Sequence, residues 1–230
     1  MKTVGLLGGM SSHSSRMYQD KLDHGVNEAL GGLHSASIIL RAYNFAEIAE
    51  LQHANKWPEL AHKLSIDAMN LESAGSDFIA LCTNTMHKVA SHIEEVLSIP
   101  FLHIADPTAE AIQEAGIQTI GLLGTAFTME ENFYKGRLTD NFGLEVIVPD
   151  EQERKIVHDV IYQELCHGDI QEDSRRSYNE IITNLMNRGA QGVILGCTEI
   201  GLLVKPEDSP IQVFDTTELH VQAILKKMLS

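Results

Sequence analysis

The sequence predicts an α/β protein made of two similar, doubly wound halves with mostly parallel sheets, related by a pseudo-two-fold axis. Three observations favour this fold. Short apolar runs alternate with longer amphipathic stretches, which is the order that builds parallel strands joined by helices. Glycine, proline, serine or aspartate bounds each short run, as expected of strand ends. Two sequence blocks also recur, in the same order, in the second half of the chain.

Eight short apolar runs are the expected strands. Each has four or five residues, and turn-forming residues separate it from its neighbours. They are Thr3–Leu7, Ser37–Leu40, Phe78–Leu81, Phe101–Ile104, Thr119–Leu123, Glu145–Val148, Gly192–Leu195 and Ile211–Phe214.

Helical patterns lie between these runs, and glycine marks several of their ends. A glycine after the last apolar position is a common helix stop because it adopts the left-handed conformation without strain. The expected helices are Ser15–Leu30, Lys56–Ala74, Glu151–Cys166, Ser174–Arg188 and a last helix near Thr216–Leu229, which we expect to return to the N-terminal half.

The internal repeat has two blocks. Thr3-Val-Gly-Leu-Leu-Gly8 recurs as Thr119-Ile-Gly-Leu-Leu-Gly124, an offset of 116 residues (119 minus 3). The block that runs from Gly75 to Thr83 recurs from Gly189 to Cys197, an offset of 114 residues (189 minus 75). Parallel strands followed by glycine turns look alike in any case, so one block alone would be weak. Two blocks at nearly equal offsets favour two equivalent halves, and the second offset pairs Thr83 with Cys197.

We therefore expect an N-terminal half of residues 1–97 plus 215–230 and a C-terminal half of residues 98–214. Equivalent strand ends would then face each other across a cleft that holds the active site.

Composition excludes several classes of function. The chain has 230 residues and a formal net charge of −15, so nucleic acid and anionic membrane surfaces are unexpected partners. No apolar run approaches the ~18 residues of a membrane span. The three cysteines, with no CxxC, argue against a disulfide framework and against a thiolate metal site. Free thiols suit a reducing compartment, so we expect a cytoplasmic protein.

Four loops at the expected carboxyl ends of strands are small and polar. Ligands of open α/β sheets bind at these ends, where glycine permits close backbone approach and hydroxyl and amide groups donate hydrogen bonds. Each loop precedes an expected helix, whose first N–H groups attract anions. The loops are Gly8–Ser12, Cys82–Thr85, Gly124–Thr128 and Gly196–Glu199. Such loops fit a small acidic substrate.

Motifs for cofactors and metals are missing. Gly5, Gly8 and Gly9 do not form G-x-G-x-x-G, and no phosphate-binding G-x-x-x-x-G-K-[ST] occurs. The 11 histidines show neither H-x-x-x-H nor H-E-x-x-H spacing. We therefore expect no cofactor and no metal.

The cysteines differ in expected role. Cys197 follows an apolar run and begins an expected helix, whose N-terminus would lower the thiol pKa. Its alternative role is that of a buried structural cysteine. Cys166 lies late in an amphipathic helix and is expected to be structural. For Cys82 two roles stay open: it points into the sheet while Thr83 faces the cleft, or it is itself the second proton-transfer group. His87 is most simply a packed or surface histidine, and Met10 either fills the core or faces the ligand.

Taken together, these motifs resemble the aspartate/glutamate racemase family over essentially the whole chain. The carriers are the N-terminal G-L-L-G-G-M-S, the segment Cys82–His87 that reads C-T-N-T-M-H, the G-T-x-x-T of Gly124–Thr128 and the G-C-T-E of Gly196–Glu199. The resemblance is greatest to the members specific for L-aspartate and L-glutamate, which share the G-G-L-H-S and T-N-T-M-H-K-V segments.

The resemblance implies racemisation without a cofactor, by two groups on opposite faces of the substrate α-carbon. One group removes the α-proton and the other returns a proton. Thr83 and Cys197 are the implied catalytic residues. The implied substrate-binding residues are Met10, Gln52, Asn84, Thr85, Thr125, Thr198 and Glu199. The substrate would be a dicarboxylic amino acid, and a homodimer is possible in this family.

The chain departs from the usual pattern at the first catalytic position. Many members have cysteine directly before the asparagine, where this chain has Thr83 before Asn84. A hydroxyl is a weaker acid and base than a thiol. We therefore expect racemisation to proceed differently from the two enantiomers, with a preference for the L-substrate. Two alternatives stay open: a one-cysteine lyase or decarboxylase of the same superfamily, and a non-catalytic protein that binds small acids.

Overall fold

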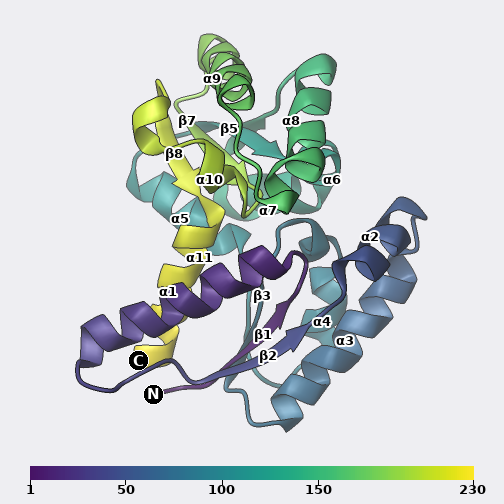
Figure 1. The fold of residues 1–230 in the computed structure, drawn as a ribbon, viewed down its shortest axis with the longest axis vertical. Helices are drawn as coiled ribbons and strands as arrows, with labels where there is room; N and C mark the ends of the chain where they lie inside the picture. Colours follow the sequence, from purple (N-terminus) through teal and green to yellow (C-terminus); the bar gives the residue numbers. More distant parts are fainter. The chain divides into compact units, whose positions relative to one another are not determined.

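The computed structural model describes all residues, 1–230, and divides into two compact α/β units (Figure 1). The first unit comprises Met1–Ile104 and His220–Ser230, and the second comprises Ala105–Leu219. The chain thus passes from the first unit to the second and returns within its last helix.

The first unit contains a parallel four-stranded sheet in the order β2-β1-β3-β4. Its strands are β1 (Val4–Gly8), β2 (Ile38–Ala42), β3 (Phe78–Leu81) and β4 (Phe101–Leu102). Its helices are α1 (Ser12–Leu30), α2 (Phe45–His53), α3 (Trp57–Ser73), the 3-10 segment η1 (Thr85–Val89), α4 (Ala90–Val96) and the end of α11 (Thr216–Leu229).

The second unit repeats this sheet in the order β6-β5-β7-β8. Its strands are β5 (Thr119–Gly124), β6 (Glu145–Ile147), β7 (Gly192–Gly196) and β8 (Gln212–Asp215). Its helical segments are α5 (Ala105–Glu114), α6 (Ala126–Glu130), α7 (Asn132–Phe142), α8 (Glu151–Gln163), η2 (Leu165–His167), α9 (Glu172–Asn187), α10 (Ile200–Leu203) and η3 (Pro206–Asp208).

Strand register confirms the internal repeat. In the first sheet Leu6 of β1 lies beside Ala80 of β3. In the second sheet Leu122 of β5 lies beside Ile194 of β7. The offsets of 116 and 114 residues convert one pair into the other. The same offset of 114 residues relates Thr83, two residues after β3, to Cys197, directly after β7, so the two occupy equivalent places relative to the paired strands.

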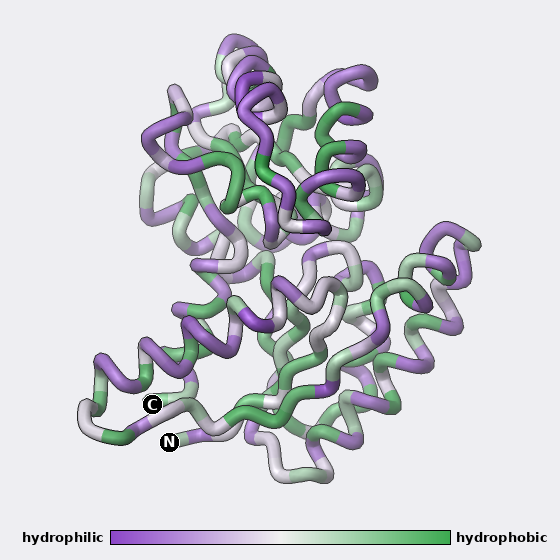
Figure 2. The backbone as a smooth tube through the Cα atoms, viewed as in Figure 1, coloured by the Kyte–Doolittle hydropathy of each residue, from purple (hydrophilic) through white to green (hydrophobic).

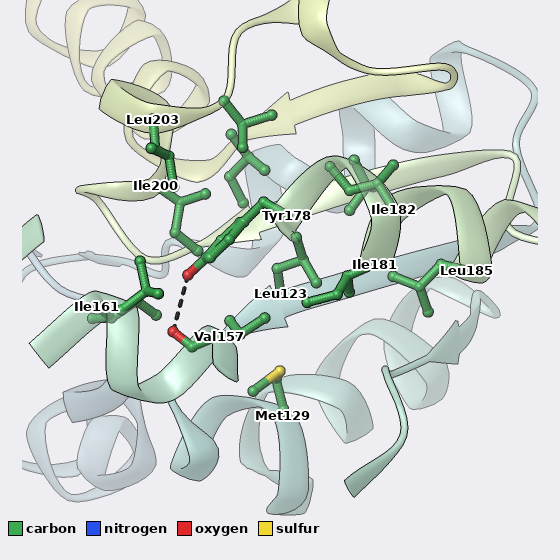
Figure 3. Close-up of a cluster of buried hydrophobic side chains, with 14 of the residues drawn as sticks. Leu123, Met129, Val157, Ile161, Tyr178, Ile181, Ile182, Leu185, Ile200 and Leu203 are labelled. Atoms are coloured by element: carbon green, nitrogen blue, oxygen red, sulfur yellow. Dashed lines mark hydrogen bonds between the residues drawn. The ribbon is translucent and has the colours of Figure 1, made fainter. Parts of the chain in front are cut away.

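Apolar strands form the centre of each unit, as the hydropathy colouring in Figure 2 shows. In the first unit α1 and the end of α11 cover one face of the sheet, where Tyr18, Leu22 and Ile224 are buried. In the second unit α8 and α9 pack on the sheet around Leu123 (Figure 3). The hydroxyl of Tyr178, buried in this cluster, donates a hydrogen bond of 2.9 Å to the carbonyl of Val157, so its polar atom is satisfied.

The expected domain limits differ from the observed ones at both points where the chain passes between the two units. A limit after residue 97 would assign β4 to the second half, but Phe101 and Leu102 pair with β3 of the first sheet. A limit after residue 214 would remove Asp215 from β8, which pairs with β7. The first unit therefore extends to Ile104, and the second extends to Leu219.

No helix of the chain combines the length and the apolar character needed to cross a bilayer.

Candidate active site

The loop after β1 is held by a close backbone approach. Gly9 has a φ of 85° and lies against the backbone of Tyr43, so a side chain at this position would collide with main-chain atoms. The Gly9 amide donates a hydrogen bond of 2.6 Å to the Ser15 hydroxyl. Met10, which follows, is 5% exposed. This loop therefore has one fixed conformation at the carboxyl end of the sheet.

The loop after β3 separates Cys82 from Thr83. Cys82 is fully buried among the core side chains of the first unit, and burial raises the pKa of its thiol. Cys82 thus points into the sheet, the first of its two expected roles, and is a poor proton acceptor. Thr83 comes directly after it, is 9% exposed, and begins a polar run with Asn84 and Thr85.

A histidine anchors this loop from within the first unit. The Nδ1 atom of His87 lies 2.8 Å from the carbonyl oxygen of Thr83. Its Nε2 atom accepts a hydrogen bond of 3.2 Å from the Ile104 amide. The sequence indicated an isolated packing histidine, and only the fold shows that it joins the ends of two neighbouring strands.

Gln52, in the same unit, has a side-chain amide with only part of its hydrogen-bonding capacity used. It lies in α2 and is 3% exposed. Its Nε2 donates to the sulfur of Met86 at 3.0 Å, which is a weak acceptor. Its Oε1 atom is buried without a hydrogen-bond partner. Buried amides are normally satisfied, so Gln52 is well suited to bind a polar group of a ligand.

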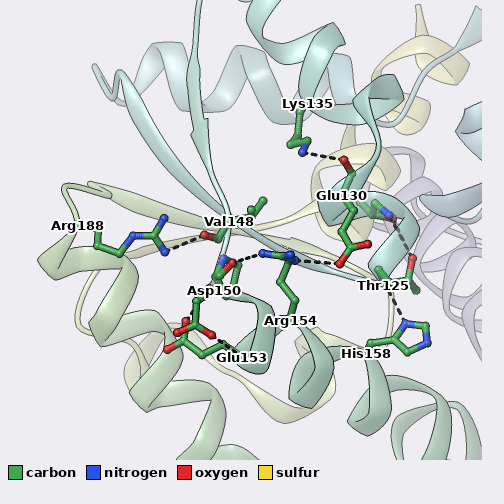
Figure 4. A network of polar contacts seen from close by, with 12 residues as sticks. Thr125, Glu130, Lys135, Val148, Asp150, Glu153, Arg154, His158 and Arg188 are labelled. Carbon is green, nitrogen blue, oxygen red and sulfur yellow. Dashed lines mark hydrogen bonds and ion pairs between the residues drawn. The ribbon is translucent and has the colours of Figure 1, made fainter.

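In the second unit the loop after β5 carries Thr125, which caps α6. The next amide, that of Ala126, donates a hydrogen bond of 3.1 Å to Nδ1 of His158 on α8 (Figure 4). An ion pair of 3.0 Å between Arg154 and Glu130 ties α8 to α6 as well. These contacts fix Thr125 at the carboxyl end of β5.

Cys197 and Glu199 form a hydrogen-bonded pair after β7, the strand beside β5. The Cys197 thiol donates to Glu199 Oε2 at 3.1 Å, and the Thr198 hydroxyl donates to the same oxygen at 2.7 Å. Glu199 is 3% exposed, whereas Cys197 is half-buried. A buried carboxylate therefore lies within reach of the thiol proton.

The expected lowering of the Cys197 pKa is wrong. Burial raises the pKa of the thiol well above its ordinary value, and the negative charge of Glu199 raises it further. The helix that was to stabilise a thiolate, α10, begins only at Ile200 and has four residues. Cys197 consequently rests as a thiol.

Two residues near this pair were not among the sequence candidates for the site. Tyr162 of α8 and Cys166 of η2 interact electrostatically with Glu199, and burial raises the pKa of both groups, that of Cys166 to about 12. The Tyr162 ring also packs against His158 at a centroid distance of 4.8 Å. His158, Tyr162 and Cys166 are spaced by four residues, a helical spacing that the sequence contained.

The sequence candidates divide between the two units. Polar loops follow the adjacent strands β1 and β3 in the first unit and β5 and β7 in the second. The first group is Met10, Gln52, Thr83, Asn84 and Thr85, and the second is Thr125, Cys197, Thr198 and Glu199. No group of three or more His, Cys, Asp or Glu side chains could hold a metal ion.

The protein is a duplicated parallel α/β protein. A threonine and a cysteine lie at equivalent positions after the central strands of its two sheets, where proteins of this fold class bind their ligands. The chain matches the family Asp/Glu/Hydantoin racemase over residues 7–224, and it belongs to that family. It is accordingly a racemase, an isomerase by class.

Individual relatives agree with this assignment. The chain is 26% identical to the broad specificity amino-acid racemase RacX of Bacillus subtilis, with 99% of this chain and 98% of that protein covered. A crystal structure of a candidate Asp/Glu racemase from Yersinia pestis is 50% identical, with a TM-score of 0.94 and full coverage of both chains. An aspartate racemase homologue from Pyrococcus horikoshii is 31% identical, with a TM-score of 0.86 and full coverage of both chains.

Proposed function

We propose that the protein interconverts L- and D-aspartate or L- and D-glutamate by two-base proton transfer at the α-carbon, without a cofactor. The observation that carries this proposal is the equivalence of Thr83 and Cys197 in two sheets of the same strand register. Racemisation needs one proton-transfer group for each face of the α-carbon, and a duplicated fold supplies two equivalent positions.

The Cys197–Glu199 pair supports the role of Cys197 as a base. The thiol has a raised pKa and rests protonated, so a proton acceptor must act before the sulfur can remove the α-proton. Glu199 accepts the hydrogen bond of the thiol and can take up its proton. The resulting thiolate removes the α-proton from one face of the substrate.

Thr83 then acts on the opposite face of the substrate α-carbon. Its hydroxyl delivers a proton to the α-carbon and regains one from water, because a free alkoxide is too basic to persist. The two groups are chemically unequal, so the barriers measured from the bound L- and D-substrates differ and the pairing favours a higher kcat for the L-substrate. The value of kcat/KM stays equal in the two directions, because the enantiomers have equal free energies in water. Thr85, Asn84, Thr125 and Thr198 would hold the substrate carboxylates by hydrogen bonds, with Met10 and Gln52 beside them.

The test is the initial rate from each enantiomer in deuterated water, for the wild type, Thr83→Ala and Thr83→Cys. We expect Thr83→Ala to lose inversion while some α-deuterium exchange persists through Cys197. We expect Thr83→Cys to raise turnover of the D-substrate relative to the L-substrate. Equal wild-type rates from both enantiomers, with Thr83→Ala unaffected, would assign the second base elsewhere. A change in substrate mass beyond deuterium would instead indicate a lyase.

A homodimer and a cytoplasmic location, both expected from the sequence, stay predictions.

A further inference from the structure

We infer that His87 is a positioning residue for Thr83: its imidazole fixes the main chain that carries the hydroxyl, through the Thr83 carbonyl and the Ile104 amide. This inference rests on the proposed function, because it assigns a purpose to the anchor of one of the two proposed catalytic groups. Nothing in the two-base reaction itself requires a histidine at this place.

The two hydrogen bonds define the tautomer of His87. The backbone amide of Ile104 can only donate, so Nε2, 3.2 Å away, must be the unprotonated acceptor. The carbonyl of Thr83 can only accept, so Nδ1, 2.8 Å away, must carry the hydrogen. Both bonds exist together only in the neutral Nδ1–H tautomer.

The surrounding side chains hold the ring in this orientation. His87 is 3% exposed. The ring of His103 packs edge-on against it at a centroid distance of 4.3 Å, and Phe101 lies at 5.7 Å. The imidazole thus acts as a rigid bridge between the loop after β3 and the end of β4.

The second unit does not use this device, although its strands have the same register. The offset of 114 residues relates His87 to Gly201, which has no side chain to form a bridge. The carbonyl of Cys197 instead accepts from the Ile200 amide at 3.1 Å. A side chain at Gly201 would collide with Asp215, the last residue of β8. The histidine bridge is therefore specific to the unit that carries Thr83.

The asymmetry fits the chemistry of the two groups. A thiol ionises far more readily than a hydroxyl, so Thr83 supplies the weaker acid–base group of the two. A misplacement of about 1 Å can reduce a rate by roughly 10²-fold. The weaker acid–base group thus has the more rigid support.

Two conservative variants test the two hydrogen bonds of His87 separately. In His87→Asn the side-chain amide can still donate from the Nδ1 position to Thr83, but it cannot accept from Ile104. In His87→Gln the amide oxygen can still accept at the Nε2 position, but the donor to Thr83 is lost. His103→Gln removes the packing partner and keeps both anchoring groups, so it is the matched control.

Racemisation and α-deuterium exchange are measured for all four proteins, with thermal unfolding to establish that each is folded. We expect kcat for inversion to fall about 10²-fold in His87→Gln and less than about tenfold in His87→Asn. Exchange on the face served by Cys197 should persist in both. His103→Gln, which removes one packing ring but neither hydrogen bond of the bridge, should lose less kcat than His87→Gln. Equal losses in His87→Asn and His87→Gln would overturn the positioning role.

The nitrogen resonances of His87 give a readout that does not depend on activity. In ¹⁵N-labelled wild type at neutral pH, we expect the Nδ1–H tautomer, and an Nε2–H or doubly protonated ring would overturn the inference even if the variants misfold. A wild type that neither racemises nor exchanges deuterium would contradict the proposed function instead, while the tautomer measurement would still decide the geometry of the anchor.

Discussion

The thiol of Cys197 and the carboxylate of Glu199 show how a reactive group can be stored in its protonated form. Burial is the main cause of the raised pKa, and the charge of Glu199 adds to it. The same carboxylate receives the hydrogen bond of the thiol. The neighbour that disfavours the free thiolate is therefore also the acceptor of its hydrogen bond.

This arrangement predicts the pH dependence of thiol alkylation. A carboxylate neighbour raises the pKa of a thiol because two negative charges repel each other. Reaction of Cys197 with iodoacetamide should therefore reach its midpoint well above pH 9 in the wild type, and at a lower pH in Glu199→Gln. Peptide mass mapping distinguishes Cys197 from Cys166 and Cys82. Racemisation should nevertheless fall in Glu199→Gln because its amide cannot take up the proton. An unchanged alkylation midpoint would show that Glu199 does not act on the thiol.

At the same scale, the sequence predicts Thr83 and Cys197 as the catalytic pair because the internal repeat pairs them and the family resemblance points to both, and this stays a prediction. It did not identify the environment of Cys197. Tyr162 comes from a helix distant in sequence, and its proximity depends on how α8 packs on the second sheet. The expected thiolate was wrong for a similar reason, since burial of Cys197 is a tertiary property that a local helix argument omits.

Among the secondary-structure elements, the strands were predictable and several helices were not. All eight strands lie within two residues of the expected runs, because a buried parallel strand is a continuous apolar segment with polar ends. Short helices such as α2 and α6 have too few turns for a clear apolar stripe. The sheet to which β4 belongs was assigned wrongly, because a two-residue strand contains no information about its partner.

The last helix is attached to the first unit by a buried histidine. His220 of α11 lies between two partners: its Nδ1 is 2.8 Å from the Tyr18 hydroxyl and its Nε2 is 3.0 Å from the Leu102 carbonyl. The carbonyl can only accept, so Nε2 carries the hydrogen and Nδ1 accepts from Tyr18. This neutral ring joins α1, β4 and α11.

Protonation of His220 should destabilise the protein in acid. Burial lowers its pKa from 6.5 to about 4. Above pH 6.5 the imidazole of His220 is neutral in both the folded and the unfolded state. Between pH 6.5 and 4 only the unfolded state takes up the proton, so the free energy of unfolding falls as the pH falls, by roughly 3 kcal/mol in total.

Urea unfolding at several pH values measures this effect, with His220→Gln as the comparison, because glutamine can still donate to Leu102 but does not titrate. The variant should lose less stability than the wild type between pH 6.5 and 4. Parallel pH profiles for the two proteins would mean that His220 titrates normally in the folded state.

The whole molecule combines a duplicated fold with a strongly negative charge. Both sheets present polar strand-end loops with few basic side chains, so hydrogen-bond donors rather than cations would supply most of the recognition of an anionic substrate. The formal net charge of −15 surrounds these loops with a field of the same sign as an acidic amino acid. An enzyme of this kind would bind its substrate against a long-range repulsion.

This repulsion predicts an unusual dependence on salt. Aspartate and glutamate carry a net charge of about −1 at neutral pH, so screening of the protein field should speed their encounter with the site. Between roughly 10 and 150 mM NaCl we expect kcat/KM to rise, by less than about tenfold. The kcat value should stay constant, because saturation with substrate removes the encounter step. If kcat/KM instead fell with added salt, basic side chains close to the strand-end loops would dominate the field there. The whole-molecule charge would then have no part in substrate capture.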